Sequence, residues 1–135
     1  MKVAITVWNN RVSPVFDVAR NVMILDISKG DINQKSLEVF THDAPQYKAS
    51  RLNQLQVSSL ICGAISSYQA RIISHHRIKI IPFITGEIEE IIDAFISDRL
   101  PNPKLMMPGC CRRQNLYQSA GHQKMVVEGV IWKKS

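Results

Sequence analysis

The sequence has no long apolar run, no secretion signal and no set of cysteines that suits a disulfide framework. Its apolar stretches stay well short of the about 20 residues that a membrane span needs. Residues 1–10 lack the apolar core and the small-residue cleavage site of a signal peptide. The three cysteines are an odd number, and Cys110 and Cys111 are neighbours that could bond to each other only in a strained ring. We therefore expect a cytoplasmic protein with reduced thiols and no membrane partner.

The larger part of the chain also lacks an excess of charge. Residues 1–98 contain ten lysines and arginines and ten acidic residues, which cancel. Residues 99–135 contain seven basic residues and a single acid, Glu128, so they carry the whole formal charge of +6. This distribution describes a neutral body with a basic tail rather than a basic nucleic-acid-binding domain. Nucleic acid is therefore not expected as a partner of the body, although the tail could contact an anion.

Eight segments predict regular structure. Strands are expected at 3–8, 21–27, 32–40, 59–65 and 78–84, and helices at about 43–56, 66–76 and 88–96. Short connections between the first three strands favour antiparallel pairing, and the helices between the later strands imply right-handed parallel crossovers. We therefore expect an α/β fold, in which helices flank a mixed five-stranded sheet with the first strand at its centre.

The ends of the predicted helices carry recognisable signals. Asp43 with Gln46, and Ser66 with Gln69, have the spacing of a capping box. The helix at 88–96 has the clearest amphipathic pattern in the chain. These signals favour three helices that each bury one face.

The chain is expected to divide into an α/β domain, residues 1–100, and a basic C-terminal tail, residues 101–135. Within the tail, residues 125–132 have the apolar pattern of one further strand, although Gly129 weakens that pattern. This strand would lie at a sheet edge or be exchanged with a partner chain. The second arrangement would make the protein a homodimer.

A binding crevice is expected where the parallel strands end. Ligands of such sheets collect outside the carboxyl ends of the strands, and the loop at 9–20 would lie over the same edge. Helices starting at Ser66 and after Gly86 would point N–H groups there, which favours an anion. The alternative is that this edge, which every protein of this architecture has, is not the binding surface. The residues expected around the crevice are Asn9, Asn10, Ser13, Phe16, Arg20, Gly63, Ala64, Ser66, Thr85 and Gly86.

Cys110 and Cys111 are the candidate metal ligands. Thiolates are the usual ligands of iron–sulfur clusters and of zinc, and the adjacent Arg112 and Arg113 would lower the pKa of both thiols. Two cysteines do not complete a four-ligand site, so His122 is a candidate third ligand, and a second chain could supply the rest. The alternative is that both thiols are unliganded. Cys62, within a predicted strand, is expected to be a small buried hydrophobe.

Three segments of the chain resemble one known family. The stretch "AITVWNNRVSPVFDVARNVMILDI" resembles the opening of the dinitrogenase iron–molybdenum cofactor biosynthesis family, which includes NifX-like and NifB C-terminal-like nitrogenase accessory proteins. Ser13, Phe16 and Ala19 match the family loop, and Gly63 and Gly86 match its two later glycine positions. The chain has Asp17 where the family loop has glycine. It also has Val15 where members that hold a cluster in this loop often have a histidine.

The resemblance implies a ribonuclease H-like fold. It also implies a non-enzymatic accessory protein that binds or carries an iron–sulfur or iron–molybdenum cluster, with a cluster donor or acceptor protein as its partner. Because valine cannot ligate iron, the tail cysteines would assist or replace ligands of the loop. Some members carry a Pro-Gly-Cys tail followed by basic residues, which "PGCCRR" resembles.

Signatures of catalysis are missing from the sequence. It contains no sequence order of serine, histidine and aspartate that indicates a catalytic triad, no phosphate-binding loop and no dinucleotide-binding fingerprint. The first strand carries no acid, so the carboxylates that a two-metal nuclease needs do not converge. We therefore expect no enzymatic activity. The alternative function is a regulatory or interaction module, in which the basic tail docks on a protein or nucleic acid and the thiols sense redox state or are bystanders.

Overall fold

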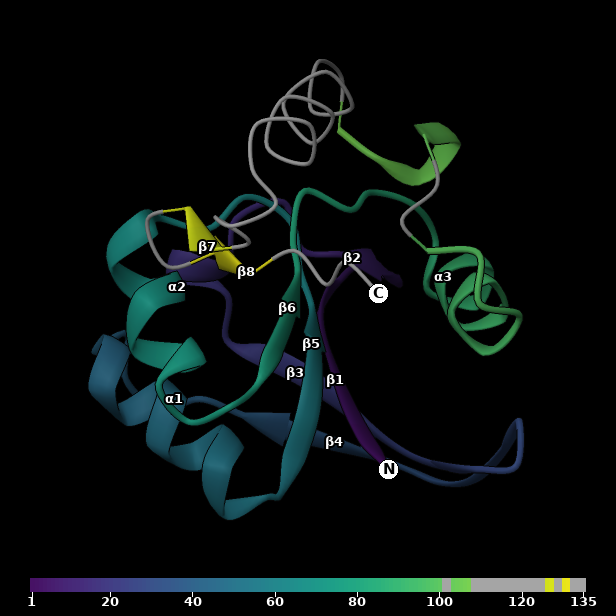
Figure 1. Cartoon of the computed structure of the whole chain (residues 1–135), viewed down its shortest axis with the longest axis horizontal. Coiled ribbons are helices and arrows are strands. Elements are labelled where there is room, and N and C mark those ends of the chain that lie inside the picture. Colours follow the sequence, from purple (N-terminus) through teal and green to yellow (C-terminus); the bar gives the residue numbers. More distant parts are fainter. Residues whose placement is uncertain (101–102, 108–125, 128–129, 132–135) are drawn as a thin grey trace.

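The structure, a computed structural model, describes residues 1–100, 103–107, 126–127 and 130–131. A mixed sheet of six strands forms its centre, in the order β4-β3-β1-β5-β6, with the short β2 paired to the end of β1 (Figure 1). The strands are β1 (Lys2–Trp8), β2 (Arg11–Val12), β3 (Asn21–Ser28), β4 (Asp31–Val39), β5 (Val57–Ile61) and β6 (Lys79–Ile81).

The central position of the first strand is confirmed. β1 pairs antiparallel with β3 and parallel with β5, and β5 pairs parallel with β6. Val3, Ala4, Ile5 and Thr6 are all completely buried, as a strand covered on both faces requires. The sheet has one strand more than predicted, because Arg11 and Val12 fold back onto β1.

Three helices cover the sheet. In Figure 1, α1 (Pro45–Gln54) and α2 (Ser67–Ser74) lie side by side on one face, and α3 (Ile88–Ile96) lies on the other. The predicted amphipathic pattern of α3 is confirmed, because Ile88, Ile91 and Ile92 are buried in the core. No helix in the described part of the chain is long and apolar enough to cross a membrane.

One of the two predicted capping boxes is wrong. The residue that caps α1 is Ala44, with Pro45 following it, and no side chain bonds to the first turn. Asp43 instead forms an ion pair with Arg20. The other prediction is confirmed in its main part, because Ser66 caps α2 and its Oγ accepts the N–H of Gln69 at 3.2 Å.

The fourth and fifth predicted strands end earlier than expected, at Ile61 and Ile81. The backbone of Phe83 has a φ of 64°, which an extended strand cannot accommodate. The segments that follow β5 and β6 stay hydrogen-bonded to each other, because the N–H of Phe83 donates to the carbonyl of Gly63 at 2.9 Å. The irregular segments that follow β5 and β6 form the edge of the sheet where a crevice was expected.

The C-terminal residues that the structure describes differ from the predicted single strand. β7 (Val126–Val127) and β8 (Val130–Ile131) pair antiparallel with each other in a separate two-stranded sheet, so the prediction of one strand over 125–132 is wrong. The 3-10 helix η2 (Pro103–Leu105) leads into Met106, which bridges to Ile84. Met107 then donates its N–H to the carbonyl of Phe83 at 2.8 Å, so residues 105–107 pack on the same sheet edge.

Candidate functional site

The loop between β2 and β3 is closed onto the sheet edge. The N–H of Ala64 donates to the carbonyl of Pro14 at 2.8 Å, and the N–H of Phe16 donates to the carbonyl of Ala64 at 2.7 Å. Val15 and Ala64 form a parallel bridge. The loop therefore continues the sheet beside the chain that follows β5. No open crevice separates the loop from Gly63 and Ala64.

Gly63 permits this closure. A Cβ placed on Gly63 would lie 2.4 Å from the carbonyl oxygen of Pro14 and 2.5 Å from that of Ser13. Both neighbours are backbone atoms that cannot move aside as a flexible side chain could. The position therefore requires glycine for close approach of two backbones.

Asn9 and Asn10 form the turn between β1 and β2. Their φ angles are 53° and 65°, the left-handed conformation that a two-residue hairpin turn needs and that asparagine tolerates. The carbonyl of Asn10 accepts the N–H of Ile88, and the carbonyl of Gly86 accepts the N–H of Val12, both at 3.0 Å. The start of α3 is thus joined to the β1–β2 hairpin.

The start of α2 is bonded to an acid from the loop. Asp17 accepts the backbone N–H of Ser66 on its Oδ1 at 3.0 Å. A carboxylate at a helix start interacts favourably with the helix dipole. The donors that were expected to attract an external anion, at Ser66 and near Gly86, therefore bond to Asp17 and Asn10 within the chain. The N–H of Thr85 likewise donates to the carbonyl of Leu105 at 2.7 Å.

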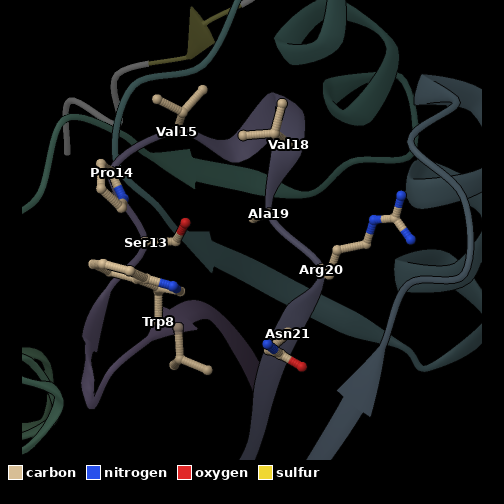
Figure 2. Close-up of a pocket in the computed structure, with 9 residues that line it drawn as sticks. Trp8, Ser13, Pro14, Val15, Val18, Ala19, Arg20 and Asn21 are labelled. Carbon is tan, nitrogen blue, oxygen red and sulfur yellow. The ribbon is translucent and has the colours of Figure 1, made fainter.

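A cavity of about 360 Å³ lies beside this loop, and Gly63 and Ala64 are not among the residues that line it. Figure 2 shows Val15 and Val18 on one side of it and Trp8 on the other. Trp8 and Val18 are 57% and 66% exposed, so the rim is apolar and accessible. The cavity is lined by Val7, Trp8, Ser13, Pro14, Val15, Val18, Ala19, Arg20 and Asn21.

Two of the residues predicted for the crevice, Ser13 and Arg20, line this cavity. Ser13 is buried, and its backbone N–H donates to the carbonyl of Thr6 at 2.8 Å. Arg20 extends away from Trp8 in Figure 2 and pairs with Asp43, with distances of 3.2 Å from Nε to Oδ1 and 3.4 Å from Nη2 to Oδ2. Phe16 is completely buried behind the loop rather than in the cavity wall. The other predicted residues lie along the closed sheet edge.

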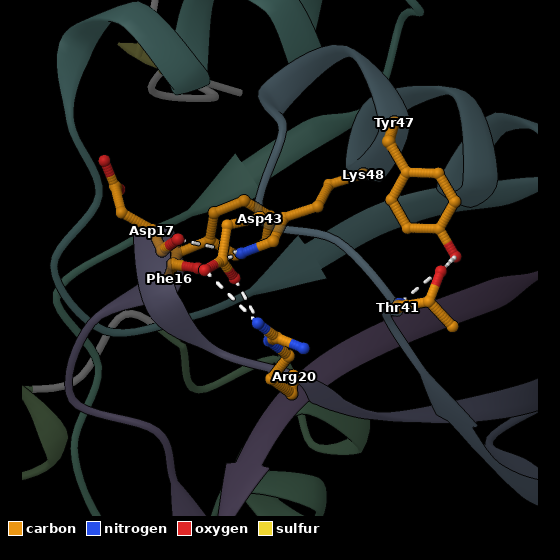
Figure 3. A network of polar contacts seen from close by, with 7 residues as sticks. All are labelled: Phe16, Asp17, Arg20, Thr41, Asp43, Tyr47 and Lys48. Atoms are coloured by element: carbon orange, nitrogen blue, oxygen red, sulfur yellow. Dashed lines mark hydrogen bonds and ion pairs between the residues drawn. The ribbon is translucent and has the colours of Figure 1, made fainter.

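Lys48 is a residue of this region that the sequence did not reveal. It lies in α1, is completely buried, and donates from Nζ to the carbonyls of Phe16 at 2.8 Å and Asp17 at 3.0 Å (Figure 3). Its Nζ also lies 4.8 Å from the ring centre of Phe16 and 5.4 Å from that of Phe40. Burial lowers the pKa of Lys48, and the nearby carboxylates of Asp43 and Asp17 oppose that shift. The one sequence signal is its position four residues before Leu52, on the buried side of the helix.

The described residues offer no complete set of metal ligands. They contain no group of three or more histidines, cysteines and acids that could hold a metal ion. Cys62 is completely buried, as predicted, and burial raises the pKa of its thiol far above the ordinary value. The cavity lining contains neither thiolate nor imidazole. The predicted ligands Cys110, Cys111 and His122 lie outside the described residues.

Solved structures of other proteins resemble this chain in fold. The protein PH0822 superposes with a TM-score of 0.69 and 19% identity, over 73% of this chain and 93% of that one. The apo form of the orange protein from Desulfovibrio gigas gives a TM-score of 0.63 and 17% identity, over 80% and 93% of the two chains. No curated protein matches the sequence.

The family described as "dinitrogenase iron-molybdenum cofactor" matches residues 1–98, which include every strand of the main sheet, all three helices and the loop that forms the cavity. This match confirms the resemblance found in the sequence. The chain therefore belongs to the dinitrogenase iron–molybdenum cofactor family.

Proposed function

We propose that the protein is a non-enzymatic accessory protein that carries an iron–sulfur or iron–molybdenum type cluster as cargo. The cargo would occupy the cavity lined by Trp8, Ser13 and Val18, and tail thiolates would be its ligands. The observation that carries this proposal is that the cavity is built on the loop at 13–21, within the part of the chain that matches the family. The sheet order, three antiparallel strands followed by two parallel ones, supports a ribonuclease H-like fold for residues 1–100.

The cavity wall suits a polarisable cluster whose iron atoms are already coordinated by its own bridging sulfides. Its apolar residues, including Trp8, Val15 and Val18, would contact bridging sulfides of a cluster by dispersion. The guanidinium of Arg20 at the rim would offset part of the negative charge of a thiolate-bound cluster. Because the lining contains no thiolate or imidazole, direct ligation of iron must come from elsewhere in the chain.

The tail leaves the body from the edge of the sheet on which the cavity lies. Met107 is hydrogen-bonded to Phe83, Phe83 to Gly63, and Ala64 to Pro14, so about three strand spacings, or ~14 Å, separate Met107 from the loop. Three residues connect Met107 to Cys110, which limits their Cα–Cα distance to about 11 Å. Cys110 therefore falls short of the loop by about 3 Å, and only a fully extended chain brings Cys111, one residue further along, level with the loop at about 14 Å. Residues 101–135 would then form a thiol-bearing tail, with His122 as a further ligand.

Two features support transfer of the cargo to or from another protein in the cytoplasm. Trp8, Val15 and Val18 are exposed apolar residues around the cavity, and such a rim suits a docking protein. The ligand count favours a homodimer, because two chains would supply the four thiolates that a cluster needs. A donor or acceptor protein, or a second copy of this chain, would therefore complete the site.

The proposal is tested by anaerobic reconstitution with ferrous iron and sulfide, read by visible absorption and bound iron. The natural chain is compared with Cys110→Ser/Cys111→Ser and with Cys62→Ala as the matched control. We expect bound iron and absorption in the natural chain and in Cys62→Ala, and at least a tenfold loss in the double variant. Equal iron in all three proteins, or none in any, would overturn the tail site.

The alternative, an interaction module with a basic tail, predicts a different result. Its support is that all excess positive charge lies in residues 99–135. Binding of phosphate-bearing partners would weaken steeply with added salt and would be indifferent to replacement of the cysteines. Cluster ligation would show the opposite pattern.

A further inference from the structure

One buried side chain, that of Lys48, adds to the backbone contacts that hold the turn behind the cavity. The 3-10 turn η1 (Phe16–Val18) precedes Ala19, and Val15, Val18 and Ala19 all belong to the cavity wall. Within the turn, the N–H of Ala19 donates to the carbonyl of Phe16 at 3.0 Å. Lys48 Nζ donates to that same carbonyl and to the next one, of Asp17. The conformation of the wall therefore depends on a residue that lies 32 positions after Phe16 and 31 after Asp17 in the sequence.

The surroundings of the Lys48 amine favour a hydrogen-bond donor at this position. The rings of Phe16 and Phe40 lie beside Nζ and meet edge to face, with centroids 6.3 Å apart and planes at 75°. Asp17 on the loop, and Asp43 and Arg20 nearby, are the charged groups that act on Lys48, and no described carboxylate forms an ion pair with its Nζ. A buried amine without a paired acid is expensive, and an apolar residue of similar length would avoid that expense. Burial alone thus does not explain a lysine here, whereas its two carbonyl contacts do.

We propose that Lys48 is a positioning residue for the cavity: by bridging the carbonyls of Phe16 and Asp17 it fixes the turn that sets the Val15–Ala19 wall. It acts through the turn and does not contact the cargo. The part of this inference that concerns cargo rests on the proposed function. The part that concerns the shape of the cavity does not, because it can be measured on the empty protein.

Amide hydrogen exchange followed by NMR separates positioning from general stability. The proteins are the natural chain, Lys48→Met, and Lys35→Met as a matched control at an exposed position of β4. In Lys48→Met we expect the Ala19 amide to exchange at least tenfold faster, while amides of the central strands, such as Ile5 and Leu60, keep their protection. A purely structural role would speed exchange at all these sites by the same factor, because they would open by global unfolding. Unchanged protection at Ala19, or a uniform loss, would overturn the proposal.

A second measurement uses the natural chain and needs no variant. NMR of the lysine amines should show protons on Lys48 Nζ that exchange with water at least tenfold more slowly than those of Lys35, with through-space contacts to the ring of Phe16. Equally fast exchange at the two amines would overturn the proposal even if Lys48→Met failed to fold.

The reconstitution assay then separates the two proposals. Loss of cargo from Lys48→Met but not from Lys35→Met would link the turn to binding. Retained cargo in Lys48→Met would refute that link. If the natural chain takes up no cargo, the proposed function fails, while the exchange data still decide the role of Lys48.

Discussion

The carbonyl oxygen of Pro14 approaches Gly63 so closely that a Cβ on Gly63 would lie 2.4 Å from it. This contact joins the loop that carries the cavity to the chain after β5. Together with the hydrogen bonds of Ala64 it fixes one side of the loop, and Lys48 fixes the other. The cavity wall is therefore held by backbone contacts on one side and by a buried amine on the other.

Replacing Gly63 by alanine should displace the loop. The added methyl group cannot be accommodated without a backbone shift, and such overpacking costs about 1–3 kcal/mol of unfolding free energy. Denaturant unfolding measures that loss, and the emission of Trp8 in a Trp132→Phe background measures the change at the cavity. Gly30→Ala is the control. The φ of Gly30 is +78°, so alanine there is strained, but a Cβ would meet no neighbouring atom and the position lies in the turn between β3 and β4. A loss of stability in Gly63→Ala with unchanged Trp8 emission would contradict the account.

The stability of the protein should increase with pH in the alkaline range because of Lys48. Its pKa is lowered by burial below the ordinary value of 10.5, so between these two values the unfolded chain binds more protons than the folded one. Under that condition the unfolding free energy rises as pH rises. A neutral amine still donates two hydrogen bonds, so the turn stays in place.

Denaturant unfolding at a series of pH values from 7 upward measures this slope in the natural chain and in Lys48→Met. Tyr47, whose pKa is lowered by its hydrogen bonds with Thr41, contributes with the same sign in both proteins, so the difference between them isolates Lys48. Parallel curves would show that the lysine is not buried.

Removing the carboxylate of Asp17 should weaken the start of α2. Asp17→Ala leaves the N–H of Ser66 without its acceptor, and loss of a side-chain cap costs about 0.5–2 kcal/mol. Asp93→Ala is the comparison, because Asp93 forms an exposed ion pair with Arg99 at 2.7 Å, which is worth about 1 kcal/mol or less. Thermal unfolding of both variants gives the two values. A smaller effect at Asp17 than at Asp93 would count against the helix-start contact.

The thiol of Cys62 should be unreactive in the folded protein. Its side chain is completely buried and burial raises its pKa, so little thiolate forms and reagents cannot reach it. In Cys110→Ser/Cys111→Ser, a colourimetric thiol reagent should react only after denaturant is added. Rapid reaction in buffer would mean that the chain following β5 opens and exposes Cys62.

Much of the fold follows from local patterns. The strand at 3–8, the apolar stripe of α3 and the cap at Ser66 are each predicted from residues close together in the sequence, and each is confirmed. Asp43 shows where prediction from local sequence patterns fails. Its spacing to Gln46 fits a capping box, but Arg20 competes for its carboxylate from 23 residues away.

The site was only partly predictable, for the same reason. Loop 9–20 and Gly63 were placed at the correct edge, yet the crevice between them is closed by backbone contacts that depend on tertiary packing. The cavity beside that loop is lined by Trp8 rather than by Gly63, and no sequence motif singles out Trp8. Lys48 was missed because a lysine near an apolar stripe is ordinarily a solvated residue.

The most direct test of the central claim is the emission of Trp8 during anaerobic loading with iron and sulfide. In Trp132→Phe, Trp8 is the one remaining tryptophan, and it lines the cavity. If the cargo lies there, its emission should fall in proportion to the visible absorption and reach its limit at the same amount of iron. Growth of the absorption with unchanged Trp8 emission would contradict the account, because the cargo would then be bound away from the cavity.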